Sequence, residues 1–316
     1  MQYAPAMLDH YRRDGFVVVT DAIPADSLDR VTADLAGIFG RRARAVGLNI
    51  ADPTEVKSFS VALTELFRHD RPSYIATARQ TQHLASVHQL GLSPPVMNVV
   101  AGLGLAIPAI STRPVIHYMS NQLKIEGGYH QSPIHQDWRS VQGSLDGITL
   151  WLPLFDVGIG DYPLEVIPGS HRRGLLPSVD DAFGHRVADG EVDAREFTPL
   201  IVRRGDVVCF SGFLVHRTGS AGGRDVRIAL SYRYNNAAES SFINRGYPSP
   251  YTYGADMRLL QQDYPTAADV APLFTDFTAN NIGLPQNLAL PFYCETKRTS
   301  SGTPRIPWAS TTLIWD

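Results

Sequence analysis

The feature that most constrains the fold is a series of short apolar segments that begins near residue 114 and alternates with clusters of Gly, Pro, Asp and Ser. Several short strands separated by turn signals are typical of an all-β sandwich or barrel. We therefore expect a β core over residues 114–235. The clearest segments are Val115–Ile125, Ile148–Phe155, Leu164–Ile167, Val207–Phe210, Phe213–His216 and Val226–Tyr234.

Residues 174–200 interrupt this pattern, because they carry several charges and few periodic apolar positions. A long segment of this kind between strands is typical of a surface insertion, and such insertions often serve as lids or binding loops. We expect residues 174–200 to be an insertion of this type in the β core.

The part of the chain before the β region has a helical character. Apolar residues recur at helical spacing from Leu28 to Phe39, and two more apolar stripes occur between residues 56 and 92. The run Phe16–Val19 is rich in β-branched residues and predicts a buried strand between two helices, the first of which stops at Gly15. Residues 1–110 are therefore expected to be mostly helical and to pack on the β core.

No linker, internal repeat or low-complexity segment divides the chain. Residues 236–316 are rich in Pro, Asn, Thr and Tyr, which favours irregular segments with a few short helices and strands. We expect one domain over residues 1–316, of the α+β class, in which a mainly β core carries N-terminal helices and a C-terminal extension.

The composition excludes several classes of partner. The formal net charge over 316 residues is −3, so no electrostatic attraction to nucleic acid or to an anionic membrane is expected. No apolar run approaches the roughly 18–20 residues of a spanning helix, and the N-terminus lacks the pattern of a secretory signal. The two cysteines, Cys209 and Cys294, are expected to be reduced thiols in a cytoplasmic protein, with one disulfide between them as the alternative.

The central chemical motif is His135-Gln136-Asp137. In a strand, residues i and i+2 project from the same face, so this triplet would place an imidazole and a carboxylate side by side. His216, at the end of the apolar segment Phe213–His216, is the natural third ligand. Two histidines and one carboxylate on one face of an octahedron suit iron(II) and leave three positions open.

An arginine follows the second histidine at a distance of eleven residues. Arg227 lies in an expected strand and would share a face with Ala229 and Ser231. An arginine on the inward face of a β barrel is costly without an anionic partner, and a carboxylate of a co-substrate would be such a partner. The alternatives are a surface arginine paired with Asp225, or Arg224 in the anchoring role.

In combination, these elements resemble the phytanoyl-CoA dioxygenase family. The resemblance rests on His135-Gln136-Asp137, Trp151, Pro168-Gly169-Ser170-His171, His216 and Arg227, and on the helix–strand–helix entry. It covers roughly residues 8–40 and 114–235. The family implies a double-stranded β-helix core (a jelly roll) and a hydroxylase that uses Fe(2+), 2-oxoglutarate and O2, with 2-oxoglutarate decarboxylated to succinate and CO2.

The resemblance also implies roles for single residues. His135, Asp137 and His216 would bind iron, and Arg227 would hold the distal carboxylate of 2-oxoglutarate. Further residues expected at the co-substrate are Thr218, Trp151, Gln122 and Lys124. Three more histidines, His117, His130 and His171, lie close to the motif in sequence and could support the ligands.

The sequence departs from the family pattern at two places, while the carboxylate ligand is intact. Asp161–Glu165 stands where the family usually has Asn-Gly, which alters a loop near the expected metal and weakens the analogy to the substrates of relatives. Ile125–Gly128 stands where the family usually has Lys-Pro-Pro or Lys-Pro-Gly. Related halogenases replace the carboxylate with a small residue, so Asp137 disfavours halogenation.

The substrate is expected to be a small molecule of unspecified identity, with Trp138 and Arg139 as candidates to contact it. Hydroxylation, desaturation, epoxidation and ring formation would use the same site. The rival interpretations are a cupin-like metal enzyme that does not use 2-oxoglutarate, and a non-catalytic β-barrel binding protein.

Overall fold

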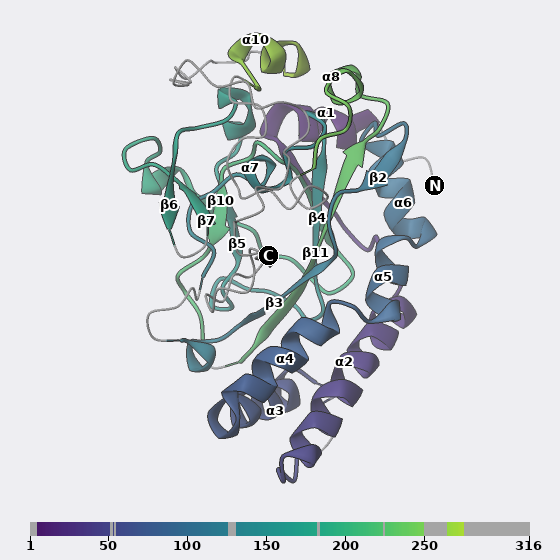
Figure 1. The fold of residues 1–316 in the computed structure, drawn as a ribbon, viewed down its shortest axis with the longest axis vertical. Helices are drawn as coiled ribbons and strands as arrows, with labels where there is room; N and C mark the ends of the chain where they lie inside the picture. Colours follow the sequence, from purple (N-terminus) through teal and green to yellow (C-terminus); the bar gives the residue numbers. More distant parts are fainter. Residues whose placement is uncertain are drawn as a thin grey trace, which may run out of the picture.

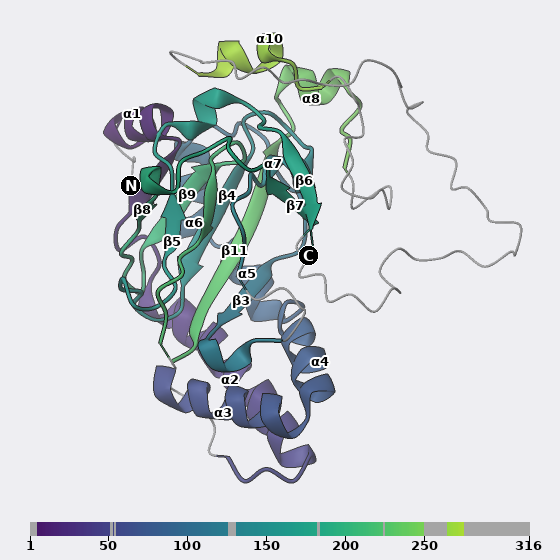
Figure 2. The ribbon, with the colours of Figure 1, turned by 90° about the vertical axis from the view of Figure 1, so that its left-hand side faces the viewer.

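The computed structural model describes residues 5–50, 53, 55–125, 131–181, 184–223, 225–249 and 264–274. Expectations for Cys294, His130, Arg224 and most of the C-terminal extension fall outside these ranges and stay predictions. In the described part, two antiparallel sheets face each other, and helices cover the outer side of the larger sheet (Figures 1 and 2). The expected mixture of helices and a β core is confirmed.

The larger sheet forms the centre of the molecule, and its longest strand, β11 (Arg227–Asn236), pairs with three others. All its pairings are antiparallel. Its spatial order is β1 (Phe16–Val19), β9 (Val207–Ser211), β4 (Ile148–Pro153), β11 and β2 (Pro108–Ile110), with β3 (Val115–Met119) also paired with β11.

The smaller sheet carries the second histidine of the candidate centre. Its order is β10 (His216–Thr218), β5 (Leu164–Val166) and β8 (Thr198–Pro199). The 174–200 region, expected to be a surface insertion, contains the hairpin β6 (Ser178–Asp181)–β7 (Gly184–Val187), the short helix η3 (Ala194–Glu196) and strand β8. Val187 N–H donates to the Ile134 carbonyl at 2.7 Å, so this region lies directly beside the His135 segment.

Helices precede the β core, as the apolar periodicity of the N-terminal part predicted, and short helices lie between and after its strands. The N-terminal ones are α1 (Pro5–Asp14), α2 (Ala25–Ala45), α3 (Val56–His69), α4 (Arg71–Thr81), α5 (Ala85–Gly91) and α6 (Pro94–Gly102). Short ones follow at η1 (Asn121–Leu123), α7 (Trp138–Val141), η2 (Ser170–Arg173), α8 (Ser240–Asn244), α10 (Ala267–Val270) and η4 (Ala271–Leu273).

The two faces of the larger sheet bury different sets of side chains, because successive residues of a strand point to opposite sides. On one face, Leu150, Leu152 and Tyr118 pack against Leu35 and Phe39 of α2 in the largest apolar cluster. On the other face, residues such as Phe210, Trp151 and Ala229 pack against Leu164 and Val166 of the smaller sheet. Burying one such leucine or phenylalanine stabilises the fold by about 1.5–3 kcal/mol relative to leaving it exposed.

Two expected strands end differently in the structure. The segment Val115–Ile125 is a strand only to Met119, because Ser120 Oγ accepts the Gln122 N–H and caps the short helix η1. The segment Phe213–His216 is not a strand: residues 212–215 form a turn and loop, and His216 begins β10. Phe213 is fully buried, which explains why its apolar neighbourhood suggested a strand.

Cys209 is a buried free thiol on β9, and burial raises its pKa well above the usual range. Within the described ranges, no helix combines the length and the apolar character that crossing a bilayer requires.

Candidate metal centre

His135, Asp137 and His216 are brought together from two chain segments. His135 and His216 form an isolated antiparallel bridge, with N–H to carbonyl distances of 3.0 and 3.1 Å in the two directions. Asp137 has helical dihedral angles and directly precedes α7. The sequence suggested that the triplet lies on a regular strand, and this expectation was wrong. The bridge fixes His135, and the turn into α7 directs the Asp137 carboxylate toward the same point.

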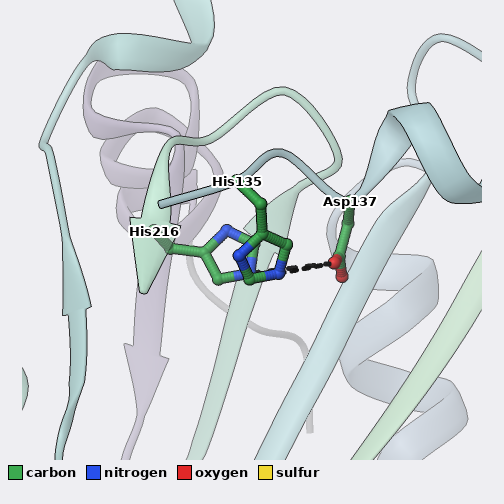
Figure 3. A group of neighbouring side chains, drawn as sticks. All are labelled: His135, Asp137 and His216. Atoms are coloured by element: carbon green, nitrogen blue, oxygen red, sulfur yellow. Dashed lines mark ion pairs between the residues drawn. The ribbon is translucent and has the colours of Figure 1, made fainter. Parts of the chain in front are cut away.

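The three side chains converge with their ligand atoms inward (Figure 3). Asp137 Oδ1 lies 3.4 Å from His135 Nε2 and 3.7 Å from His216 Nε2. One ligand atom from each residue falls within 4.8 Å of the others, and all three residues are buried. This spacing leaves room for one ion between them.

The imidazoles are oriented to present Nε2 to a metal. The Nδ1 atoms lie 2.8 Å from the Pro133 carbonyl oxygen for His135 and 2.9 Å from the Leu214 carbonyl oxygen for His216. A carbonyl only accepts, so each Nδ1 is assigned the proton and each Nε2 keeps its lone pair. Burial, and to a smaller extent the neighbouring His135, lowers the pKa of His216 to about 3. This ring is therefore neutral at physiological pH.

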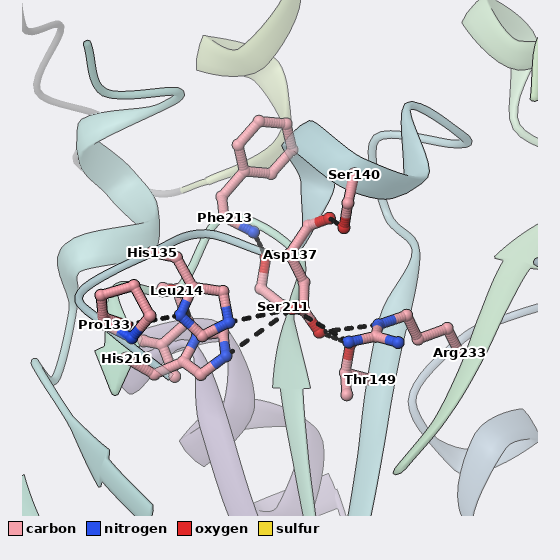
Figure 4. Close-up of polar contacts among 10 residues, drawn as sticks. All are labelled: Pro133, His135, Asp137, Ser140, Thr149, Ser211, Phe213, Leu214, His216 and Arg233. Carbon is pink, nitrogen blue, oxygen red and sulfur yellow. Dashed lines mark hydrogen bonds and ion pairs between the residues drawn. The ribbon is translucent and has the colours of Figure 1, made fainter. Parts of the chain in front are cut away.

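The Asp137 carboxylate has two donors outside the histidine pair (Figure 4). Thr149 Oγ1 donates to Oδ2 at 2.6 Å, and Arg233 donates through Nε to Oδ2 at 3.0 Å and through Nη2 to Oδ1 at 3.3 Å. Burial alone would raise the pKa of Asp137, but Arg233 and the two histidines hold it well below its usual range. The carboxylate is therefore ionised, and the donor set of two imidazoles and one carboxylate fits an ion such as iron(II).

Arg233 and Thr149 were not identified from the sequence. They are cross-strand neighbours on β11 and β4, so their approach to Asp137 depends on a register that a single sequence does not show. One signal was present: Arg233 lies six residues after Arg227, at the even spacing that keeps strand residues on one face. Extending the face of Arg227, Ala229 and Ser231 by two residues would have reached it.

Arg227 lies on the inward face and is buried, which excludes the surface-arginine alternative. It shares a cavity with the three candidate ligands. Its Nη1 donates to the Tyr162 carbonyl oxygen at 2.6 Å, and its guanidinium carbon lies 5.6 Å from the centre of the Trp151 ring. Trp151 and Thr218 line the same cavity, so three of the residues expected at the co-substrate surround the candidate metal ligands.

The other expected co-substrate residues lie elsewhere. Gln122 belongs to η1 and accepts a hydrogen bond from Arg68 of α3, and Lys124 is exposed. Neither lines the cavity that holds the candidate ligands. The strand alternation on which their placement depended ends at Met119, so a role for them at the co-substrate stays a prediction.

The candidate substrate residues, Trp138 and Arg139, also lie outside the cavity that holds the candidate ligands. Trp138 packs in a separate apolar cluster and stacks on Phe213, with ring centres 5.5 Å apart. Arg139 donates to the Leu176 carbonyl oxygen at 3.0 Å, and burial lowers its pKa to about 10. Neither lines the cavity around the candidate metal ligands, and contact with a substrate stays a prediction for both.

Of the supporting histidines, His117 lines the cavity and His171 does not. His117 points inward from β3 opposite Ala229, and burial together with Arg227 and Arg233 lowers its pKa to about 3. His171 is buried behind α1, where its Nε2 lies 3.0 Å from the Arg12 carbonyl oxygen.

The sequence is similar to a known family and to several known proteins. A family model described as phytanoyl-CoA dioxygenase (PhyH) matches residues 11–229. The peroxisomal phytanoyl-CoA dioxygenase of Homo sapiens is 21% identical over 72% of this chain and 67% of its own length. Phytanoyl-CoA dioxygenase domain-containing protein 1 of Rattus norvegicus is 30% identical over 51% of this chain. The alignments span 56% of the rat protein and 26% of phytanoyl-CoA dioxygenase 1 of Oryza sativa.

Solved structures agree on the fold. EctD from S. alaskensis, solved with 2-oxoglutarate and 5-hydroxyectoine, has a TM-score of 0.50 at 16% identity and covers 75% of this chain and 78% of EctD. The non-heme monooxygenase ThoJ also has a TM-score of 0.50 at 16% identity, with 73% of this chain and 77% of ThoJ covered. The jelly-roll fold of the core is thereby confirmed.

Proposed function

Because the chain belongs to the phytanoyl-CoA dioxygenase family, we propose that it is an iron(II)- and 2-oxoglutarate-dependent oxygenase that oxidises a C–H bond of a small-molecule substrate. The observation that carries this proposal is the buried cluster of His135, Asp137 and His216, which shares one cavity with the buried Arg227. Hydroxylation is the proposed outcome at the substrate.

In this function, His135 Nε2, His216 Nε2 and Asp137 Oδ1 hold the metal. When bound, iron(II) and 2-oxoglutarate supply the oxidising chemistry with O2, and 2-oxoglutarate is converted to succinate and CO2. The ligand set of two histidines and one carboxylate with open positions is the one that suits such oxygenases.

Arg227 anchors 2-oxoglutarate by gripping its distal carboxylate. A planar guanidinium binds a carboxylate through two parallel hydrogen bonds, and burial strengthens that interaction. The Tyr162 carbonyl oxygen holds one end of the guanidinium, which fixes its direction. Trp151 forms a wall beside Arg227, and Thr218 of β10, which lines the same cavity, would assist with its hydroxyl.

The surroundings also favour a small molecule as substrate. A neighbouring cavity of about 510 Å³ shares Ser132, Arg217 and Thr218 with the cavity of the metal ligands. That volume lies within the range of about 300–1,000 Å³ typical of small-ligand sites. Burial of the ligand residues keeps bulk water from the reacting centre.

The test is an anaerobic titration with iron(II) and 2-oxoglutarate that follows the weak visible charge-transfer band of the chelate. We expect a band in the wild type and none in His135→Ala. In Arg227→Ala the dissociation constant for 2-oxoglutarate should rise on the order of 100-fold, because losing one partner of a buried charge pair typically costs about 2–5 kcal/mol. The exposed His83→Ala serves as the matched control and should behave as the wild type.

Absence of the band in folded, iron-loaded wild-type protein would refute the proposal. That result would favour a cupin-like metal enzyme that does not use 2-oxoglutarate if turnover with another substrate is found. It would favour a non-catalytic binding protein if none is found.

A further inference from the structure

The two oxygens of Asp137 have different surroundings. Oδ2 accepts hydrogen bonds from Thr149 Oγ1 at 2.6 Å and from Arg233 Nε at 3.0 Å. Oδ1 faces the two histidine Nε2 atoms and receives only the longer Arg233 Nη2 contact at 3.3 Å. A carboxylate oxygen that accepts two strong donors has its lone pairs engaged, so Oδ2 is occupied and Oδ1 is left for a metal.

The larger sheet supplies both donors to Oδ2. Arg233 of β11 and Thr149 of β4 are directly opposed across the antiparallel pair, and both point to the inner face. The Arg233 side chain is only 14% exposed, and Thr149 is buried. Since β4 and β11 are neighbouring inner strands of the sheet, the pair forms a cradle for one side of the carboxylate (Figure 4).

We infer that Arg233 is a positioning residue that, together with Thr149, keeps Asp137 bound to the metal through one oxygen only. The inference rests on the proposed function for its consequence. A carboxylate that binds through both oxygens takes an additional position on the metal. In the proposed function 2-oxoglutarate and O2 would need the open positions, so a second Asp137 oxygen would compete with the co-substrate.

The type of residue matters as well as its charge. The guanidinium presents two donors in a rigid fork and contacts both carboxylate oxygens, so it fixes the rotation of the carboxylate about its own axis. A lysine would keep the positive charge but offers no fork. Arg233→Lys therefore separates neutralisation of Asp137 from control of its orientation.

The test uses wild type, Arg233→Met, Arg233→Lys and Thr149→Val, each loaded with a divalent metal. Infrared difference spectra with ¹³C-labelled aspartate report the separation of the two carboxylate stretches, which is wide for one-oxygen binding and narrow for two-oxygen binding. Metal affinity and the anaerobic 2-oxoglutarate titration are measured on the same samples. Arg204→Met is the matched control, because Arg204 forms an ion pair with Asp29 far from the centre.

We expect a wide separation in the wild type and the control, and a narrow one in Arg233→Met. The 2-oxoglutarate dissociation constant should rise on the order of 10-fold or more in that variant, with metal binding no weaker than in the wild type. Arg233→Lys should resemble Arg233→Met more than the wild type, and Thr149→Val should shift the separation in the same direction by a smaller amount.

The inference is overturned if the separation stays wide in Arg233→Met and Thr149→Val, or if metal affinity falls while 2-oxoglutarate binding is unchanged. Either result would mean that Arg233 only supports the local structure. Failure of the proposed function has a different signature: the wild type would bind metal without any 2-oxoglutarate band, and the carboxylate separation would still report on Arg233.

Discussion

At the scale of single residues, Gln136 ties the segment of the candidate ligands to the surrounding backbone. It lies between His135 and Asp137 and is buried. Its side-chain amide donates to the carbonyl oxygens of Gly174 at 2.7 Å and Phe213 at 2.6 Å, and its oxygen accepts the Leu176 N–H at 2.7 Å. The amide thus connects the first two ligands to the turn that leads into His216.

We expect Gln136→Leu to lower both stability and metal affinity. The substitution leaves two carbonyls and one N–H buried without this partner, at about 1–3 kcal/mol each, so the free energy of unfolding should fall by several kcal/mol. Metal affinity should fall by about 10- to 100-fold, the usual effect of losing a group that orients ligands. Chemical denaturation and metal titration below the transition measure the two effects.

The exposed Gln89→Leu on α5 is the control and should change neither quantity. A Gln136→Leu protein with wild-type metal affinity would show that the bridge between His135 and His216 alone fixes the ligand spacing.

The residue scale also shows what the sequence could and could not predict at the site. The spacing of His135, Asp137, His216 and Arg227 selected four residues that the structure places around one cavity. The contacts of Arg233 and Gln136 were not foreseen, because they depend on which strand lies beside which and on where a turn brings a backbone carbonyl. Gln122 and Lys124 were placed by alternation along a strand that the Ser120 cap ends early.

At the scale of elements, the loop at the start of η2 connects the end of the first helix to the segment of a candidate metal ligand. Gly169 N–H donates to the Asp14 carbonyl oxygen at 2.8 Å, at the end of α1. Ser170 Oγ accepts the Val215 N–H at 2.9 Å, next to His216. The sequence predicted that α1 ends at Gly15, but it did not predict that this end packs on the loop, since the contact joins segments about 155 residues apart.

Gly15 lies directly against the His171 ring of η2. Its φ of +79° lies in the left-handed region, and a Cβ there would overlap the His171 ring. We expect Gly15→Ala to destabilise the protein by about 2–5 kcal/mol, from backbone strain of about 1–2 kcal/mol and overpacking of about 1–3 kcal/mol. Thermal and chemical unfolding would measure this loss.

Gly47→Ala is a matched control for the backbone contribution. Gly47 has a φ of +83°, but no atom lies within 4 Å of a Cβ built there. Its substitution should cost only the strain of about 1–2 kcal/mol. Equal losses at Gly15 and Gly47 would show that the His171 ring moves aside freely, and that the loop does not depend on this contact.

At the scale of the whole molecule, the larger sheet separates two apolar regions with different tasks. Its outer face and the helices form the largest cluster, which contains no candidate ligand. Its inner face packs against the smaller sheet and borders the cavity. The spacing of apolar residues predicted strands and helices in about the right places. It did not predict which face of the sheet each helix covers, because that depends on how the strands assemble.

This separation predicts that stability and metal binding can be changed independently. Phe39 of α2 and Phe210 of β9 are both almost fully buried, but they lie on opposite faces of the sheet. Phe39 contacts Tyr118, with ring centres 5.5 Å apart, whereas Phe210 lies 4.7 Å from the His216 ring. Truncating either to alanine should lower the free energy of unfolding by about 3–5 kcal/mol.

Only Phe210→Ala should also weaken metal binding, by about 10-fold or more, because the His216 ring loses the surface that holds its orientation. Phe39→Ala should keep the metal affinity of the wild type when both are titrated below their unfolding transitions. Equal weakening in both variants would mean that the sheet transmits a loss of packing from its helical face to the ligands. The rigidity of β4, β9 and β11 would then be insufficient to isolate the centre, and the role inferred for Arg233 would depend on the helices as well as on the strands.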